Sequence, residues 1–279
     1  MASTSATTSP ESLTDSSLAT NASSPLSARF AALRQQGQRA LVCYMTAGHP
    51  DPAQSIELLH GLEAAGADVI EVGVPFSDPL ADGPVIQRSS QIAIEQGVTL
   101  DRALTIIAEA SLSVPVVLFS YLNPIIAAGA DVLARARAAG VSGVLVTDLP
   151  VGADPMREEW FGASGLDFVR LVAPTTPTDR MAEIARHGGG FVYLISRLGV
   201  TGEQETLSSE LPATVARLRS ATHLPICIGF GISTPDQART ASRLGDGVVV
   251  GSAIVRAAER SVAEAVALTA AMRAAIDAP

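Results

Sequence analysis

Short apolar runs alternate with longer amphipathic segments along most of the chain. The short runs are rich in Val, Ile and Leu and have the length of buried strands; they span residues 41–45, 68–72, 114–119, 143–146, 168–172, 191–195, 225–229 and 247–250. The longer segments carry apolar residues at helical spacing; they include 52–65, 100–110, 131–139, 179–187, 211–220 and 235–244. This alternation predicts parallel strands joined by right-handed helical crossovers.

Eight strand–helix units in roughly 240 residues predict an α/β fold of the (β/α)8 TIM-barrel type. A doubly wound open sheet is the alternative, but the turn at 46–50 after the first strand lacks the G-x-G-x-x-G of that fold. Residues 1–27 are rich in Ser, Thr and Ala and contain no basic side chain. We therefore expect a disordered N-terminal extension over 1–27 and one catalytic barrel domain over 28–279.

Functional residues of such a barrel belong at the carboxyl ends of the strands and in the loops that follow them. Two of these loops are long, one from residue 73 to about 89 and one from residue 197 to about 210, and long loops in a compact domain are usually binding loops or lids.

The charge of the chain narrows the classes of function. Its 279 residues are 47% hydrophobic, and the net charge is −9. Such an acidic chain is not expected to bind nucleic acid, since affinity for the phosphate backbone requires a basic surface. All 19 basic residues are Arg and none is Lys, so the chain has no side-chain amine for a Schiff base, for anchoring pyridoxal phosphate or for a P-loop.

Other features favour an ordinary cytoplasmic protein. No apolar stretch reaches transmembrane length, so no membrane association is expected. The start of the chain has neither the basic and apolar regions of a secretory signal nor the arginines of a transit peptide. Cys43 and Cys227 lie in apolar runs and are expected to be buried and reduced. The four histidines have no metal-ligand spacing, so no metal site is expected.

Glu71 is the strongest catalytic candidate on position alone. It is an acidic residue in the otherwise apolar second strand, near the carboxyl end. A surface position is improbable there because helices cover every strand of a closed barrel. Burial would raise the pKa of an inward carboxyl and suit it to acid–base work near neutral pH. The following loop adds Asp78 and Asp82, for which turn formation and substrate binding are equally good explanations.

Glycines after the last two strands predict a phosphate site. Strand seven is followed by Gly231, and strand eight by Gly251 and Ser252. Glycine lets backbone amides approach an anion, and the N-terminus of the next helix adds its dipole. Thr201 and Gly202 in the strand-six loop could close over the same group.

Five segments resemble the tryptophan synthase α subunit family. The stretch EVGVPFSDPLADGP at 71–84 is similar to the signature of that family almost letter for letter. LVAPTTP at 171–177, SRLGVTG at 196–202, GFGIS at 229–233 and VGSAIV at 250–255 match in the same order. The resemblance extends from about residue 26 to the end of the chain.

The resemblance implies a carbon–carbon lyase of tryptophan biosynthesis. The family cleaves indole-3-glycerol phosphate by a retro-aldol reaction to indole and glyceraldehyde 3-phosphate. It implies an α2β2 heterotetramer in which a β subunit carries pyridoxal phosphate and receives the indole, so no cofactor is expected in this chain. A stand-alone lyase of the same fold and a non-catalytic subunit that activates a partner are the alternatives.

The resemblance also assigns site residues. The catalytic glutamate of the family falls on Glu71, and the aspartate that holds the indole N–H falls on Asp82. The substrate-binding positions fall on Tyr193, Thr201, Gly202, Phe230, Gly231, Gly251 and Ser252. Among these, Phe230 is expected beside the indole, and the glycines and Ser252 around the phosphate.

Overall fold

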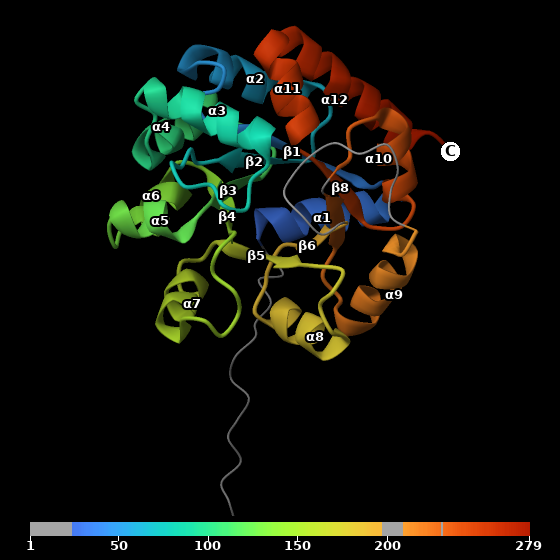
Figure 1. Cartoon of the computed structure of the whole chain (residues 1–279). Coiled ribbons are helices and arrows are strands. Elements are labelled where there is room, and N and C mark those ends of the chain that lie inside the picture. Colours follow the sequence, from blue (N-terminus) through green and yellow to red (C-terminus); the bar gives the residue numbers. More distant parts are fainter. Residues whose placement is uncertain (1–23, 197–208, 230) are drawn as a thin grey trace, which may run out of the picture.

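Eight parallel strands form a closed barrel in which each strand pairs with its neighbour in the sequence and β8 pairs with β1. The computed structural model describes residues 24–196, 209–229 and 231–279, and its strands lie at the centre of the molecule (Figure 1). The strands are β1 (Ala40–Thr46), β2 (Val69–Gly73), β3 (Val116–Ser120), β4 (Val141–Val146), β5 (Asp167–Val172), β6 (Val192–Ile195), β7 (Ile226–Gly229) and β8 (Gly247–Val250). The predicted TIM barrel is therefore confirmed.

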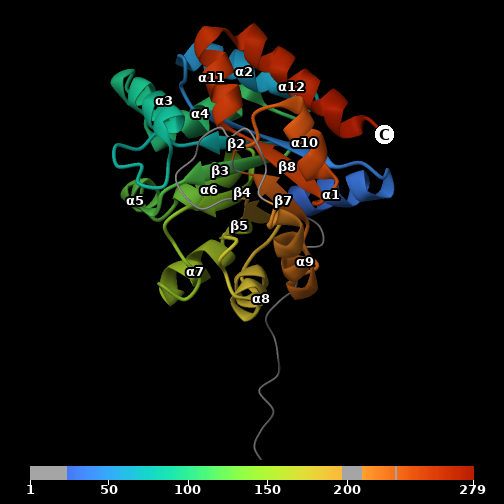
Figure 2. The same cartoon turned by 45° about the vertical axis from the view of Figure 1, so that its right-hand side comes forward.

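Helices surround the barrel, as the two views in Figures 1 and 2 show. They are α1 (Pro25–Gln35), α2 (Pro52–Ala64), α3 (Pro84–Glu95), α4 (Leu100–Ala110), α5 (Leu122–Ala127), α6 (Val132–Ala138), α7 (Pro155–Gly162), α8 (Thr178–Arg186), α9 (Leu211–Ala221), α10 (Pro235–Ser242), α11 (Ser252–Arg260) and α12 (Val262–Asp277). The six segments that the sequence singled out as helical are all helices here. No helix within the described ranges has both the length and the apolar composition that crossing a membrane requires.

The loop after β2 is shorter than the sequence suggested. It was expected to run to about residue 89, but α3 begins at Pro84. Gly83 is extended and forms the N-cap, and proline at the first helical position has its φ angle already set for a helix. Ile86 and Ala93 then face the core from α3. The loop therefore comprises residues 74–83, whereas most of the other long loop, 197–208, lies outside the described residues.

The first helix begins inside the segment expected to be disordered. Residues 25–27 belong to α1, and the Ser24 side chain caps this helix by accepting a hydrogen bond from the Ser27 N–H. Residues 1–23 lie outside the described part of the chain. The folded domain thus includes residues before the expected boundary at 28.

Helix α1 closes the amino-terminal end of the barrel. Leu26, Phe30 and Leu33 form one buried cluster with inward side chains of the strands, such as Val42, and with Phe191, which directly precedes β6. The rings of Phe30 and Phe191 lie 5.5 Å apart. Polar contacts fix the same helix: Ser24 Oγ donates to Asp167 at 2.5 Å, and Arg29 pairs with Asp68. The interior is consequently filled at this end, which leaves the carboxyl ends of the strands for a site.

Asp68 ties the first and last helices to the barrel. Its carboxylate accepts hydrogen bonds from the Leu41 backbone N–H at 2.7 Å and from Arg273 of α12 at 2.9 Å, in addition to the Arg29 pair. The side chain is 3% exposed. Since a buried carboxylate is stable only when it is paired, this cluster acts as one unit that joins α1, β2 and α12.

Candidate active site

The period-two alternation of β2 directs Glu71 into the barrel. Val69, two residues earlier, belongs to the interior cluster, whereas Ile70 and Val72 face the surrounding helices. Glu71 is in register with Tyr44 of β1 and Val117 of β3. It is 1% exposed. The carboxyl group therefore lies inside the barrel, on the side away from α1.

The surroundings of Glu71 favour its protonated form. Neither carboxyl oxygen has a hydrogen-bond partner within the described residues. Burial raises the pKa of Glu71 from its ordinary value of 4.5 to about 8, because a charged carboxylate loses its hydration there. At neutral pH this group holds a proton that it can donate to a bound molecule.

Asp82 is buried at the end of the loop after β2, 7% exposed. The Tyr121 hydroxyl donates a hydrogen bond to its Oδ2 atom at 3.1 Å. Burial raises the pKa of Asp82 from 3.8 to about 6, and the Tyr121 hydrogen bond opposes the rise. At neutral pH the group is mainly ionised.

The structure separates the two aspartates that turn chemistry alone left equal. Asp78 is exposed and accepts a hydrogen bond from the neighbouring Ser77 hydroxyl at 2.6 Å, as a residue in an ordinary surface turn does. Asp82 is buried and held by a side chain from a different loop. A carboxylate available to a ligand in the barrel mouth is thus Asp82.

Two tyrosines enter the barrel mouth over glycines of the neighbouring strands. A Cβ atom on Gly73 would lie 2.1 Å from the Tyr44 hydroxyl, and one on Gly229 would lie 2.3 Å from the Tyr193 hydroxyl. Any larger residue at either position would displace a buried aromatic ring. Burial raises the pKa of Tyr193, and the charge of Glu71 adds to the rise, so these two groups lie within electrostatic reach of each other.

The N-terminus of α11 has no side-chain cap within the described residues. Gly251 is its N-cap and makes no side-chain cap, and Ser252 is the first helical residue. In α10, by contrast, Thr234 and Gln237 form a capping box that satisfies the equivalent N–H groups. A Cβ on Gly251 would lie 3.5 Å from the Cβ of Tyr44, which places this helix end next to the aromatic side chains. Gly231 follows β7 with a φ angle of +85°.

Three of the expected substrate-binding residues, Thr201, Gly202 and Phe230, lie outside the described residues. Gly231, Gly251 and Ser252 follow the carboxyl ends of β7 and β8, and Asp82 lies at the end of the loop after β2. Glu71 and Tyr193 lie within β2 and β6. The sequence reasoning missed Tyr121, which directly follows β3. Its position after a strand was the one available signal, since its partner Asp82 lies 39 residues earlier.

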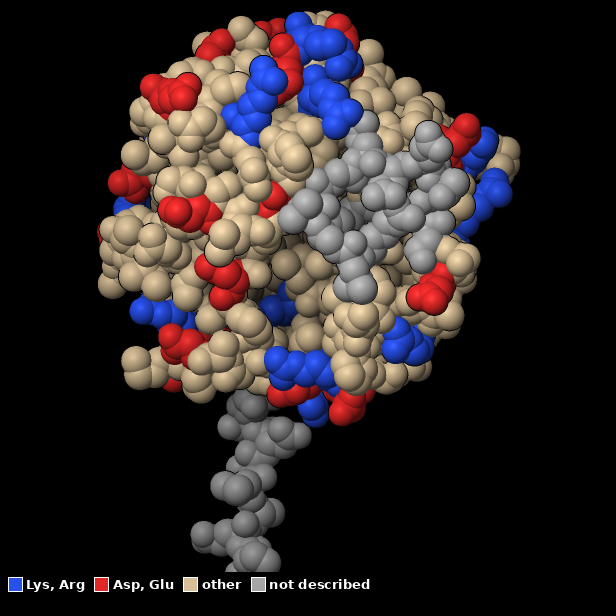
Figure 3. Space-filling model, in the orientation of Figure 1, with Lys and Arg blue, Asp and Glu red and all other residues tan. Residues whose placement is uncertain are grey.

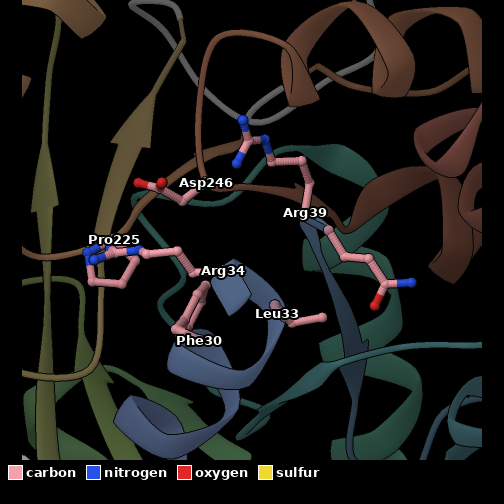
Figure 4. Close-up of a pocket in the computed structure, with 7 residues that line it drawn as sticks. Phe30, Leu33, Arg34, Arg39, Pro225 and Asp246 are labelled. Atoms are coloured by element: carbon pink, nitrogen blue, oxygen red, sulfur yellow. The ribbon is translucent and has the colours of Figure 1, made fainter. Parts of the chain in front are cut away.

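A small pocket lies at the other end of the barrel. Phe30 and Leu33 of α1 form its apolar wall, and Arg34 and Arg39 extend over it (Figure 4). Pro225 and Asp246 complete the lining from the segments that precede β7 and β8. Because these segments lead into the amino ends of strands, this pocket is separate from the carboxyl groups of the candidate site.

Metal ligation and broad basic surfaces find no support in the described part of the chain. It contains no cluster of three or more His, Cys, Asp and Glu side chains that could hold a metal ion. On the face shown in Figure 3, acidic and arginine side chains are interspersed among neutral residues. Both cysteines are buried and free. Within the described residues, the site offers two carboxyls, aromatic hydroxyls and backbone donors.

Comparison with known proteins gives a consistent result. The family model described as "Tryptophan synthase alpha chain" matches residues 30–277. The tryptophan synthase alpha chain of Gluconobacter oxydans is 45% identical over 237 residues, which is 84% of this chain and 88% of that protein. The alpha chain of Burkholderia multivorans is 45% identical over 257 residues, 89% of this chain and 95% of that protein.

Solved structures agree with the sequence relatives. A structure of Mycobacterium tuberculosis tryptophan synthase superimposes with a TM-score of 0.85 at 33% identity, over 92% of this chain and 99% of that one. Tryptophan synthase subunit alpha from Legionella pneumophila gives a TM-score of 0.83 at 33% identity, over 91% and 98% of the two chains.

Proposed function

The chain belongs to the tryptophan synthase alpha chain family, lyases that cleave indole-3-glycerol phosphate, and we propose that Glu71 and Asp82 carry out this cleavage. The reaction is a retro-aldol cleavage that gives indole and glyceraldehyde 3-phosphate. One observation carries the assignment: both carboxyls are buried, but Glu71 has no hydrogen-bond partner within the described residues whereas Asp82 accepts from the Tyr121 hydroxyl. Burial accordingly raises the pKa of Glu71 to about 8 and that of Asp82 to about 6. Environments that separate two pKa values in this way assign one group as acid and the other as anion.

In the first step, protonated Glu71 donates its proton to C3 of the indole ring. The ring becomes a cation whose charge lies largely at its N–H, and the Asp82 carboxylate accepts a hydrogen bond from that N–H and stabilises the charge. In the second step, the Glu71 carboxylate takes the proton of the hydroxyl on the carbon attached to C3. The C–C bond breaks, the hydroxyl carbon becomes the aldehyde, and the bonding electrons neutralise the ring.

The ring therefore serves as the electron sink. A Schiff base is the usual means of stabilising the electrons released in an aldol cleavage, and it requires a lysine that this chain lacks. Two carboxyls are sufficient once the indole is protonated at C3.

The remaining site residues are proposed to hold the substrate. The phosphate is assigned to Gly202, Gly231, Gly251 and Ser252, where the uncapped N-terminus of α11 provides backbone donors and a favourable dipole. Thr201 is assigned to closure of the strand-six loop over the substrate. Tyr193 and Phe230 are assigned to the indole ring, an assignment that the buried position of Tyr193 supports.

Membership of the family implies a β-subunit partner. We propose an α2β2 heterotetramer in which the β subunit carries pyridoxal phosphate and converts the released indole to tryptophan. The absence of lysine supports this division, since pyridoxal phosphate needs a lysine amine. Two free buried cysteines support a cytoplasmic location, where thiols stay reduced.

The test is to assay the purified chain alone and with a β subunit. We expect slow cleavage of indole-3-glycerol phosphate by the chain alone, copurification with the β subunit, and faster cleavage with tryptophan formation when serine is added. Full activity alone with no stimulation would favour a stand-alone lyase. No cleavage in either case, with a stimulated β subunit, would favour a non-catalytic activating subunit.

A further inference from the structure

Tyr121 lies at the junction between β3 and α5, where it is the N-cap of α5 and 5% exposed. Neighbouring contacts fix its backbone: Ser120 Oγ donates to the Tyr121 carbonyl at 2.9 Å, and Asp148 accepts from the Leu122 N–H at 2.7 Å. The ring extends from this junction to the loop that carries Asp82. It is therefore a side chain on a firm support that reaches a separate loop.

The hydroxyl of Tyr121 has its proton direction determined by its partners. The Ala81 backbone N–H donates to the hydroxyl oxygen at 2.9 Å. The hydroxyl in turn donates to Asp82 Oδ2 at 3.1 Å. An amide N–H can only donate and an ionised carboxylate can only accept, so the O–H bond points at Asp82.

The same ring contacts the first part of the loop. The rings of Phe76 and Tyr121 lie 5.2 Å apart and are tilted by 37°. Tyr121 consequently contacts the loop near its start, at Phe76, and at its end, at Ala81 and Asp82. At the far side of Asp82, the Gln87 side chain of α3 donates to the Asp82 carbonyl at 2.8 Å.

We infer that Tyr121 is a positioning residue for the cleavage reaction, whose hydroxyl orients the Asp82 carboxylate and favours its ionised state. The inference rests on the proposed function, in which Asp82 must be ionised to hold the indole N–H. The second carboxylate oxygen, which Tyr121 does not bind, is the one left for the substrate. The family signature marks Asp82 itself, whereas the role of Tyr121 follows from its contacts.

Electrostatics agrees with the geometry. A hydrogen bond to a carboxylate favours the charged form, and the Tyr121 bond limits the rise in the pKa of Asp82. Burial and the charge of Asp82 raise the pKa of Tyr121 itself, so the phenol keeps its proton at the pH of an assay. The other titratable groups nearby are Tyr44 from β1, which responds to the charge of Asp82, and Asp148, which faces Tyr121.

The experiment measures kcat/KM for indole-3-glycerol phosphate from pH 5 to 9 in four forms of the αβ complex: unmodified, Y121F, D82N and the double variant. Tyr121→Phe retains the ring contact with Phe76 and removes only the hydroxyl. We expect its acid limb, which reports Asp82, to move up by about one pH unit, because a hydrogen bond to a charged group is lost. When Asp82 is already replaced by Asn, adding Y121F is expected to cause no further change in the pH profile.

The outcomes separate the inference from the function on which it rests. If D82N abolishes the acid limb but Y121F leaves the limb in place, Tyr121 has no positioning role and the function of Asp82 stands. If D82N retains the rate and the limb, the proposed role of Asp82 fails, and the inference fails with it.

A second variant keeps the test decisive should the Phe variant fold poorly, which far-UV circular dichroism would reveal. Incorporation of 2,3-difluorotyrosine at position 121 retains the shape and makes the hydroxyl a stronger donor. The acid limb is then expected to move to lower pH. A limb that does not move would overturn the inference.

Discussion

Replacing Glu71 by Gln separates the stability cost of an ionised buried carboxyl from its use in catalysis. Gln has nearly the same volume as protonated Glu and carries no charge at any pH. Since neither oxygen of Glu71 has a hydrogen-bond partner within the described residues, the substitution breaks no hydrogen bond there. The two proteins then differ mainly in whether the group ionises.

The size of the effect follows from the pKa of Glu71, which burial raises from 4.5 to about 8. Between these values the folded state binds more protons than the unfolded state. The stability of the unmodified protein therefore falls as pH rises through this range. Relative to the Gln variant, the loss amounts to about 1 kcal/mol at pH 5 and about 4 kcal/mol at pH 8.

Urea unfolding at pH 5 and at pH 8 measures this difference directly. We expect E71Q to be more stable than the unmodified protein by about 4 kcal/mol at pH 8 and by only about 1 kcal/mol at pH 5. Its cleavage of indole-3-glycerol phosphate should fall by about 10²- to 10⁴-fold, the usual contribution of a general acid–base group. An equal stability difference at both pH values would refute the raised pKa, and wild-type turnover would refute the catalytic role.

Glu63→Gln is the matched control, because the surroundings of Glu63 lower the pKa of its carboxyl whereas those of Glu71 raise it. Its Oε1 atom accepts hydrogen bonds from the Ser113 hydroxyl and from the Ser113 and Val114 N–H groups. Burial alone would raise the pKa of Glu63, but these bonds lower it overall. A group whose pKa is lowered by folding stabilises the folded state at pH values above its unfolded pKa, and this stabilisation is lost as the pH falls. E63Q should therefore be less stable than the unmodified protein at neutral pH, and the difference should shrink in acid.

Three further substitutions test other parts of the structure. Asp82→Asn should lower kcat by about 10²- to 10³-fold, because the positive charge on the indole ring is no longer stabilised. Asp78→Asn, at the exposed turn, should have little effect on kcat. The reverse pattern would assign the stabilisation of the indole charge to Asp78. Phe30→Ala should lower the free energy of unfolding by about 3 to 5 kcal/mol in urea titrations. Gln35→Ala, on the exposed side of α1, is the control. If both substitutions changed the free energy of unfolding by the same small amount, this helix would not close the barrel. Asp68→Ala should cost about 1 to 3 kcal/mol, because the buried Leu41 N–H and two partly exposed arginines lose their acceptor. A change below about 0.5 kcal/mol would show that the cluster is not a unit.

Much of the barrel could be predicted because its signals are local. Strand length, helical spacing and proline at the first helical position each lie within a few residues of the element they define. The coverage of every strand by helices in a closed barrel also indicated that Glu71 points inward. The predicted loop after β2 is too long because a Gly-Pro pair is compatible with a loop as well as with a helix start, and here Gly83 is the extended N-cap of α3.

The contacts that tune the site could not be predicted, because they join distant parts of the sequence. Asp82 and Asp78 are equivalent as turn residues, and in the structure they differ by the burial of Asp82 and by its contact with the Tyr121 hydroxyl, 39 residues away. The fit of Tyr44 over Gly73 likewise depends on the register of two neighbouring strands. Such pairs are set by the closure of the barrel, which local periodicity does not encode.

The position of α1 has a consequence for the order in which the chain folds during synthesis. This helix leaves the ribosome before any strand, yet Ser24 bonds Asp167, 143 residues later, and Phe30 packs on Phe191. Contacts of such long sequence separation form late, since a large loop must close first. The apolar side of α1 remains without its final partners until β5 and β6 have emerged, and it is exposed in that interval. The first helix to be made is thus among the last to be buried.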